Sequence, residues 1–197
     1  MAKKDTELEI IGGKQPILLS APHVFAHRRP SLAGLYKQGE PWTDHIVKQI
    51  CEKSNSYGIY AASETNYDPN YYKIHKNNYK KKVKKLIIEK KIKYFFDIHG
   101  LSDEYEYDFG IYYLNRYNKS KDLAYDLAKA LNKGGLRNCL PQILNLNIGK
   151  AESLTEFTAS KLKVPSLQIE VSRYIREDKV LRKSLVENFS DFLTSLY

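Results

Sequence analysis

Residues 94–100 place an aspartate and a histidine directly after an aromatic segment and just before a glycine. The aromatic residues at the start of this stretch predict a buried strand. Because Asp97 and His99 lie two residues apart, we expect their side chains to project from the same face of that strand. In an open α/β sheet, ligands bind beyond the carboxyl ends of the strands. The pair therefore indicates metal binding or acid–base chemistry, against the plainer alternative of a turn histidine hydrogen-bonded to a nearby aspartate.

A second histidine follows another predicted strand. Residues 16–20 are mostly apolar and lead into Ala21, Pro22 and His23, where the proline ends the strand pairing and keeps the chain extended. We therefore expect His23, like His99, at the carboxyl end of a buried strand. One such histidine is usually structural, whereas two at the ends of separate strands point to a shared site.

The carboxylate that would complete such a site has two candidates. The segment from Glu40 to Asp44 predicts the start of a helix that runs to about residue 54, since a proline suits the first helical turn. The helix dipole favours a carboxylate there whatever its role. Catalytic zinc commonly takes three protein ligands, including a His/His/Glu set, so either Glu40 or Asp44, one helical turn later, could supply the third. Zinc is inferred from the ligand types, and iron, cobalt or nickel could occupy the same site.

A third strand is predicted over residues 164–173, where apolar residues alternate with Gln168 and Glu170. A carboxylate late in a buried strand is costly unless it is paired or used. Beside a metal, Glu170 could act as a general acid/base, and Arg173 could neutralise a substrate carboxylate or a developing oxyanion. The alternative is a buried ion pair between Glu170 and Arg173.

Two loops carry further candidates. Residues 24–39 form a long basic segment without predicted structure, and loops of this kind are often functional. Arg28 and Arg29 of this segment could bind a substrate carboxylate in a bidentate pair, or they could lie on a solvated surface loop. Residues 66–72 are turn-like and rich in tyrosine, and they could close over a site or fill a surface loop.

The remaining pattern predicts alternating strands and helices in one domain. The 197 residues suffice for a single core of ordinary size. Further strands are expected over residues 8–11, 56–62 and 109–114, and helices over residues 76–90, 119–132, 154–162 and 177–197. In the last of these helices, Val180 is among the expected packing residues. Residues 145–149 are expected to form an irregular loop.

Composition and charge limit the classes of function. No apolar run could span a bilayer, and no signal peptide is recognised, so we expect a cytoplasmic protein that does not enter membranes. Cys51 and Cys139 lack any motif spacing and are expected to be reduced thiols. The formal net charge of +9 owes much to lysines between residues 80 and 91, which predict the solvated outer face of a helix. A surface for nucleic acid or an acidic polymer is the alternative, but no nucleic-acid motif is present, so nucleic acid is not an expected partner.

Taken in order, these motifs resemble the N-formylglutamate amidohydrolase family. The likeness extends over roughly residues 18–176 and rests on Ser-Ala-Pro-His, Glu40-x-x-x-Asp44, Asp97-Ile98-His99-Gly100 and Gln168-Ile169-Glu170 with Arg173. It implies a zinc carboxypeptidase-like, phosphorylase/hydrolase-like α/β fold. In such a fold a mixed, largely parallel twisted sheet of about eight strands is flanked by helices. It also implies zinc-dependent amide hydrolysis, with His23, Glu40 and His99 as the metal ligands and Glu170 as the general acid/base.

One departure from the family concerns the substrate. The family's Asp-x-Asn-Arg motif appears here as Asp68-Pro69-Asn70 followed by Tyr71, without the arginine. By the resemblance, Asp68 and Asn70 are expected in substrate binding, and Arg28, Arg29 or Arg173 could replace the missing arginine. The departure bears on the identity of the substrate, not on the reaction class.

The sequence thus predicts a metal-dependent amidohydrolase that acts on a small or peptide-like N-acyl amide resembling N-formylglutamate. Within enzymes, the alternative is a peptidase or a cell-wall amidase on the same scaffold. Outside enzymes, the alternative is a binding protein that has lost catalysis and uses its basic surface for an acidic partner.

Overall fold

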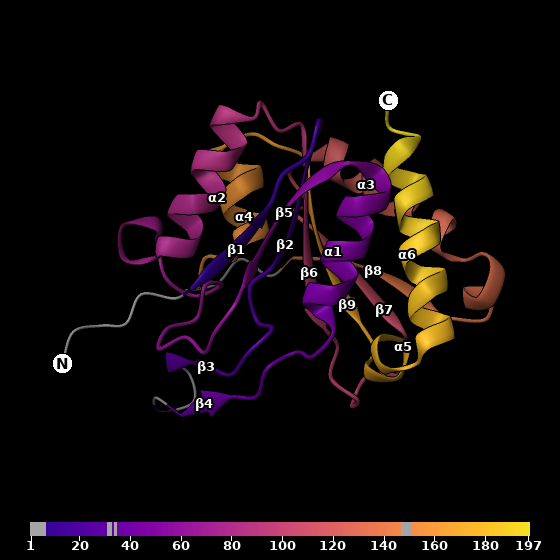
Figure 1. Cartoon of the computed structure of the whole chain (residues 1–197), viewed down its shortest axis with the longest axis horizontal. Helices are drawn as coiled ribbons and strands as arrows, with labels where there is room; N and C mark the ends of the chain where they lie inside the picture. The colour runs from indigo at the N-terminus through magenta and orange to yellow at the C-terminus, as the bar shows by residue number, and fades with distance from the viewer. Residues whose placement is uncertain (1–6, 31–32, 34, 147–150) are drawn as a thin grey trace.

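A seven-stranded mixed sheet forms the centre of the computed structural model, with helices on both faces (Figure 1). The structure describes residues 7–30, 33, 35–146 and 151–197. The strand order is β1-β5-β2-β6-β9-β7-β8. The strands span β1 Leu8–Ile11, β2 Gln15–Ala21, β5 Ser56–Ala61, β6 Tyr94–Gly100, β7 Phe109–Tyr113, β8 Pro141–Asn145 and β9 Ser166–Val171. The helices span α1 Thr43–Ser54, α2 Asn78–Glu89, α3 Asn118–Leu131, α4 Leu154–Lys161, α5 Arg173–Glu177 and α6 Lys179–Thr194.

Parallel pairing of the central strands brings their carboxyl ends to one edge. β2 pairs with β6, and β6 pairs with β9, all in parallel, whereas β1 and β7 run antiparallel to β5 and β9. The register sets His99 opposite Glu170 and Asp97 opposite Gln168. Since side chains alternate along a strand, these four polar side chains share one face of neighbouring strands. The sheet therefore gathers them before any loop contributes.

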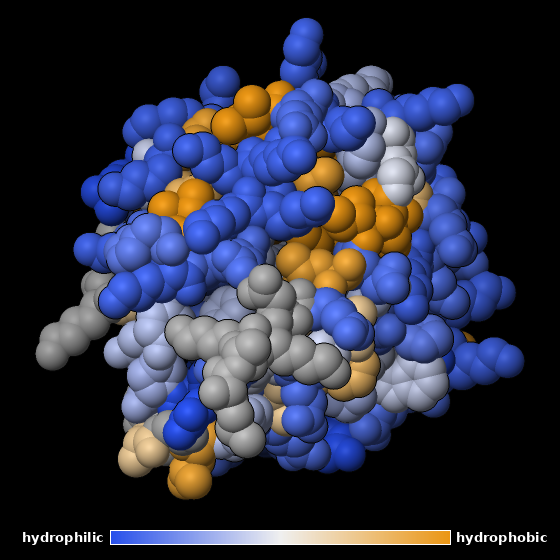
Figure 2. All heavy atoms as spheres, turned by 60° about the vertical axis from the view of Figure 1, so that its left-hand side comes forward, coloured by the Kyte–Doolittle hydropathy of each residue, from blue (hydrophilic) through white to orange (hydrophobic). Residues whose placement is uncertain are grey.

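Two apolar layers hold the sheet. One packs α1, α3 and α6 against residues such as Leu19, Phe96 and Ile169. The other packs α2 and α4 against Leu18 and Phe95 on the opposite face. Figure 2 brings the α2 side forward and shows a mostly hydrophilic surface with smaller hydrophobic areas. Because both faces of the sheet are buried, the central strands consist mostly of apolar residues, and polar side chains are concentrated at their carboxyl ends.

The predicted α/β architecture is confirmed, while several local details differ. The resemblance implied about eight strands, and the main sheet of the described residues has seven. The expected unstructured loop at residues 24–39 contains a small antiparallel sheet of β3, His27–Arg28, and β4, Tyr36–Lys37. Strand β8 was not predicted, since only Ile143 and Leu144 of its five residues are aliphatic. It includes Asn145, and residues 147–149 of the loop expected there lie outside the described residues.

Three further predictions fail for reasons of packing. The helix expected from Glu40 begins at Thr43, because Trp42 adopts a left-handed conformation with φ of 71°. The C-terminal helix is split into α5 and α6 around Asp178, whose side chain accepts hydrogen bonds at the start of α6 and leaves Val180 exposed. Lys80, expected on the solvated face of α2, is buried and donates to the carbonyl of Tyr72.

Two other sequence expectations concern cysteines and membranes. Cys51 and Cys139 are both unpaired and buried, as predicted for free thiols. Within the described ranges, every helix is too short or too polar to cross a bilayer.

Replacement of Phe96 by alanine tests the core beneath the polar edge. The Phe96 ring is fully buried and meets the ring of Phe189 edge to face, with centroids 5.4 Å apart. Because the change leaves a cavity, we expect Phe96→Ala to lower the free energy of unfolding by about 3–5 kcal/mol in urea titrations. The control Ile88→Ala removes a side chain that is 60% exposed and should change it by less than about 0.5 kcal/mol. Equal effects of the two changes would contradict this packing.

Candidate metal centre and active site

His23 and Glu40 are brought together by their backbones. His23 follows β2, and its carbonyl accepts a 2.8 Å hydrogen bond from the backbone N–H of Glu40. Gly39 permits this approach, since a Cβ there would lie 2.5 Å from the carbonyl oxygen of Val24. Only a glycine fits at that distance, so the loop can place Glu40 directly beside the end of β2.

The carboxylate of Glu40 lies between the two histidines. Its Oε1 is 3.4 Å from His23 Nδ1, and its Oε2 is 3.2 Å from His99 Nδ1. The backbone N–H of Gly100 also donates to Oε2 at 3.0 Å. All three side chains are at least nine-tenths buried. The alternative carboxylate, Asp44, points elsewhere and pairs with Lys48 at 3.5 Å.

Each histidine uses its other ring nitrogen to contact a buried aspartate. His23 Nε2 is 2.9 Å from Asp68 Oδ1, and His99 Nε2 is 2.9 Å from Asp97 Oδ2. Both aspartates are almost fully buried. Such outer carboxylates fix the orientation of an imidazole and leave the opposite nitrogen free to bind a ligand.

In the described part of the chain, two groups of buried side chains have ligand atoms within 4.8 Å of one another: His23, Glu40 and His99, and His23, His27 and Asp68. Ring geometry distinguishes them. The His23 and His27 rings are stacked, with centroids 3.9 Å apart and planes 8° from parallel. Since a nitrogen lone pair lies in the plane of its ring, two stacked rings do not converge on one ion. The rings of His23 and His99 meet at 62°, which allows their Nδ1 atoms to converge.

The spacing in the first group also suits a metal. Metal–nitrogen and metal–oxygen bonds of about 2.0–2.1 Å at tetrahedral angles separate neighbouring ligand atoms by about 3.3 Å. The two contacts to Glu40 measure 3.4 and 3.2 Å. His23 Nδ1 is moreover buried without a hydrogen-bond partner among the described residues. The donor set His/His/Glu is one that catalytic zinc uses, so these residues fit the ion.

Charge interactions shift the protonation of this group. Burial lowers the pKa of His99, but the charges of Asp97 and Glu40 outweigh it and raise that pKa well above 6.5. The pKa of His23 is raised in the same way, against its burial, by Glu40 and Asp68. Burial favours a higher pKa for Glu40, yet the two histidines hold it well below its usual value. By contrast, burial and the charge of His23 lower the pKa of His27 to about 4.

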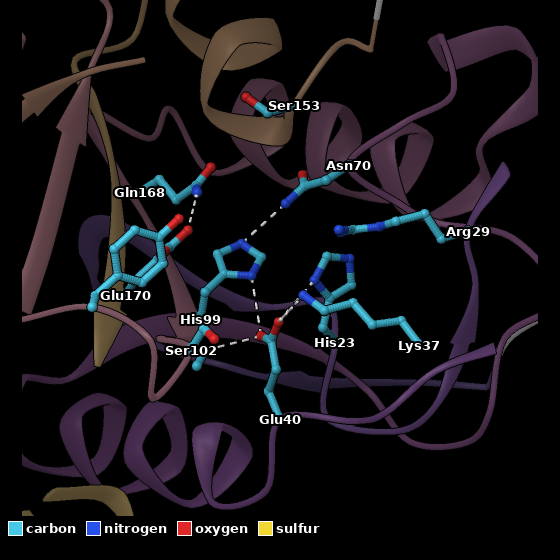
Figure 3. Close-up of a pocket in the computed structure, with 12 residues that line it drawn as sticks. His23, Arg29, Lys37, Glu40, Asn70, His99, Ser102, Ser153, Gln168 and Glu170 are labelled. Carbon is cyan, nitrogen blue, oxygen red and sulfur yellow. Dashed lines mark hydrogen bonds and ion pairs between the residues drawn. The ribbon is translucent and has the colours of Figure 1, made fainter. Parts of the chain in front are cut away.

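An open cavity of about 360 Å³ lies over this group (Figure 3). Glu170 and Gln168 line one side, and Arg29 and Lys37 line the other. Gln168 Nε2 donates to Glu170 Oε1 at 2.9 Å, and burial raises the pKa of Glu170 despite the nearby charge of His99. The cavity therefore has a carboxyl group suited to proton transfer on one side and two cations on the other.

The structure brings most of the sequence candidates to this cavity, but not all. His23, Glu40, His99, Glu170, Arg29 and Asn70 line it. Asp68 lies behind His23 and pairs with Arg29 at 2.9 Å, so it contacts the histidine rather than the open space. Arg28 is not among the lining residues. Arg173 is not brought to this cavity either. It begins α5, is exposed, and pairs with Glu177 at 2.7 Å, so the considered ion pair with Glu170 is not present.

Several lining residues were not singled out from the sequence. Ser153 immediately precedes α4, where it caps the helix by accepting from the Glu156 N–H. Ser102 and Tyr105 come from the loop after β6. Lys37 belongs to the basic segment of residues 24–39, and the sequence predicted no individual role for this lysine. A capping serine is recognisable in sequence, but nothing local shows that this helix end faces the carboxyl edge of the sheet.

Comparisons with known proteins bear on the fold. No protein-family model matches the chain, and no curated protein matches it in sequence. Solved structures do match. Gene product Atu2144 from Agrobacterium tumefaciens superposes with a TM-score of 0.69 at 12% identity, over 97% of this chain and 93% of that one. An N-acetylmuramoyl-L-alanine amidase from Clostridium difficile 630 gives a TM-score of 0.59 at 12% identity, over 92% and 96%.

A third match is a succinylglutamate desuccinylase from Vibrio parahaemolyticus, with a TM-score of 0.60 at 12% identity, over 95% of this chain and 61% of that one. At this level of identity the likeness concerns the fold. The chain thus has the mixed, mostly parallel α/β fold of phosphorylase/hydrolase-like proteins, and it is structurally similar to amidases and desuccinylases.

The charge pattern predicts an unusual titration in metal-free protein. By NMR, the His99 ring should titrate above pH 6.5 and the His27 ring at about 4. Because the pKa of folded His99 is raised, its contribution to stability is complete below 6.5 and is lost as the pH rises through the folded value. Asp97→Asn removes the negative charge beside His99 and should lower both the pKa of His99 and this contribution.

Urea titrations at two pH values check this prediction. Asp97→Asn should destabilise the protein more at pH near 6 than at alkaline pH, whereas Asp126→Asn, at an exposed position on α3, should show no such difference. A His99 ring that titrates below 6.5 in the wild type would show that burial outweighs its two carboxylates.

Proposed function

We propose that this protein is a metal-dependent amidohydrolase that cleaves a small N-acyl amide resembling N-formylglutamate. The observation that carries the proposal is the buried cluster of His23, Glu40 and His99, whose ligand atoms lie within 4.8 Å of one another, with each Nδ1 atom 3.2–3.4 Å from one oxygen of the Glu40 carboxylate. Here Glu40, not Asp44, is the carboxylate ligand. The similarity of the fold to an amidase and a desuccinylase supports the reaction class.

The outer contacts support the same assignment. In the metal-binding tautomer, His99 Nε2 donates to Asp97 and His23 Nε2 donates to Asp68. His99 Nε2 then cannot also accept from Asn70, whose Nδ2 lies 3.0 Å away. The Asn70 amide, fixed by a 2.7 Å bond from the Leu154 N–H to its Oδ1, instead directs its N–H groups to Asp97 and the cavity. Asn70 is thereby placed to contact a substrate.

A bound zinc ion would supply a Lewis acid that lowers the pKa of water to about 7. Glu170 would accept the proton of the attacking water and transfer it to the leaving amine. The raised pKa of Glu170 suits both steps, since a carboxyl group with a pKa nearer to neutrality can gain and lose a proton readily. Glu170 sits opposite His99 on the neighbouring strand, so it faces the same space as the metal ligands.

Arg29 is the residue best placed to hold a substrate carboxylate. Arg29 lines the cavity and pairs with Asp68. Asp68 begins the segment Asp68-Pro69-Asn70, which in the family that the sequence resembles is followed by an arginine and here is not. A guanidinium from the β3 segment therefore occupies the neighbourhood where that arginine is missing. Its Nε donates to Asp68, and its remaining N–H groups can bind a carboxylate in a fork. This arrangement favours a carboxylate-bearing amide, and a cell-wall amidase on the same scaffold remains the second candidate because of the fold it shares with one.

Metal content tests the ligand set. Protein purified without chelators should contain about one zinc ion per chain, because two oriented imidazoles and a carboxylate form the three-ligand set of a catalytic zinc site. His99→Ala should lose the metal. The control His75→Ala changes an exposed histidine and should retain it. Elemental analysis of the three proteins gives the answer, and equal metal content in all of them would remove His99 from the site.

Glu170→Gln tests the proton-transfer role separately from metal binding. On whichever N-acyl amino acid the wild type hydrolyses, we expect turnover to fall by about 100- to 10,000-fold, since glutamine cannot exchange a proton. Metal content should stay the same, because Glu170 is not one of the ligands. Glu187→Gln, at a partly exposed position on α6, serves as the control. Wild-type turnover in Glu170→Gln would exclude this mechanism.

A further inference from the structure

A second cavity of about 220 Å³ adjoins the candidate active site. It shares Lys37, Glu40, Gly100 and Ser102 with the first cavity, so the two spaces lie on either side of these residues. Its other side is formed by α5, which contributes Arg173 and Arg176. Nothing in the proposed reaction uses this space.

Arg176 is the unusual member of this lining. It is only 3% exposed, and its guanidinium donates to two backbone carbonyls, those of Val171 at 3.0 Å and Pro41 at 2.5 Å. Among the described residues, no carboxylate lies within ion-pair distance of it. Glu40 and Glu177 act on it only from farther away, and burial still lowers the pKa of Arg176. A buried charge without a close counter-ion is costly unless it serves a ligand or a partner.

The backbone at Gly100 lies close to the Arg176 guanidinium. A Cβ on Gly100 would lie 2.9 Å from Arg176 Nη2 and 3.1 Å from Glu40 Cγ. Nη2 makes no hydrogen bond to the described residues, while Nε and Nη1 are both used. Because Gly100 has no side chain, the Arg176 guanidinium fits against it. The N–H groups of Nη2 therefore remain available for a ligand in the second cavity.

The other charges of the cavity favour an anion. Lys37 Nζ is 3.6 Å from Glu40 Oε1, and Arg173 donates its Nε to Glu177 while its other N–H groups stay available. Asp103, in the exposed loop after β6, and Glu40 are the acids of the lining. With Glu40 bound to a metal, as the proposed function has it, three cations face a single exposed aspartate.

We propose that the second cavity is a carboxylate-binding subsite for the acyl group of the substrate. This inference rests on the proposed function, in which Arg29 holds the carboxylate on the amine side. A formyl group is too short to reach beyond Glu40, whereas a short acyl chain that ends in a carboxylate would extend from the first cavity into the second. The guanidinium of Arg176, with Arg173 and Lys37, would bind that carboxylate. The substrate class is thus an amide of a dicarboxylic acid.

Binding of a free dicarboxylate tests the subsite without relying on catalysis. The probe is glutarate, with its neutral diamide as the matched ligand, titrated by calorimetry into zinc-loaded protein, the state in which the metal binds Glu40 and offsets its charge. Glutarate should bind at least tenfold more tightly than the diamide. Arg173→Gln and Arg176→Gln should each weaken it, by about tenfold for Arg176→Gln, while Arg137→Gln, at an exposed position, should not.

Other outcomes of the titration would overturn the subsite. Equal binding of glutarate and the diamide would do so, as would loss of binding in Arg29→Gln alone, which would place the ligand in the first cavity. If Arg176→Gln fails to fold, judged by circular dichroism, Arg173→Gln decides the result, because Arg173 is exposed and its replacement disturbs no core contact.

Hydrolysis separates this inference from the proposed function. N-succinylglutamate should be cleaved with a kcat/KM at least tenfold above that of N-butanoylglutamate, which has a neutral acyl chain of the same length. In Arg173→Gln the ratio should fall toward one. Equal rates on both compounds in the wild type would refute the subsite and leave the amidohydrolase. Glutarate binding that depends on Arg173 and Arg176, without hydrolysis of any N-acyl amino acid, would refute the amidohydrolase and support the subsite.

Discussion

The carboxylate of Glu40, shared between the imidazoles of His23 and His99, is the interaction on which the rest of the site depends. It joins the carboxyl ends of β2 and β6, which parallel strand pairing already places side by side. Each imidazole is held from behind by a buried aspartate, so the five groups form one chain of alternating acids and bases. Because all five groups are buried, removal of any one of them would leave a neighbouring charge without its partner and would destabilise the folded protein.

The backbone around Glu40 is arranged to serve this interaction. Gly39 lets the loop lie against residues 24 and 25, and Gly100 leaves space for Glu40 and Arg176. Trp42 adopts a left-handed conformation that delays the helix until Thr43. The guanidinium of Arg182 lies over the Trp42 ring at 4.1 Å, and Arg176 binds the carbonyl of Pro41. Two arginines from the C-terminal helices thus stabilise the strained segment that follows Glu40.

The same design explains why cations and anions alternate through the site. Glu40 and Asp68 are acids whose pKa values are held low by neighbouring histidines and Arg29, in spite of burial. Glu170 is the exception, since burial raises its pKa and it accepts a hydrogen bond from the neutral amide of Gln168. An acid with a low pKa suits metal binding, whereas one with a raised pKa suits proton transfer. Environment rather than residue type therefore separates the proposed roles of Glu40 and Glu170.

The sequence by itself determined the features that follow from strand periodicity. Because side chains alternate along a strand, Asp97 and His99 had to share a face, as did Gln168 and Glu170, and the alternation of apolar runs indicated the α/β class. Only the tertiary structure decided which loop residues meet them. Glu40 lies between the histidines while Asp44 turns away, Asp68 lies behind His23, and Arg29 reaches the cavity while Arg173 does not. Loops have no periodicity, and their positions depend on contacts between segments far apart in the chain, such as Gly39 against Val24 and Arg176 against Pro41. Burial of Lys80 in a helix of otherwise solvated lysines has the same cause, since its partners Tyr72 and Glu152 come from two different loops.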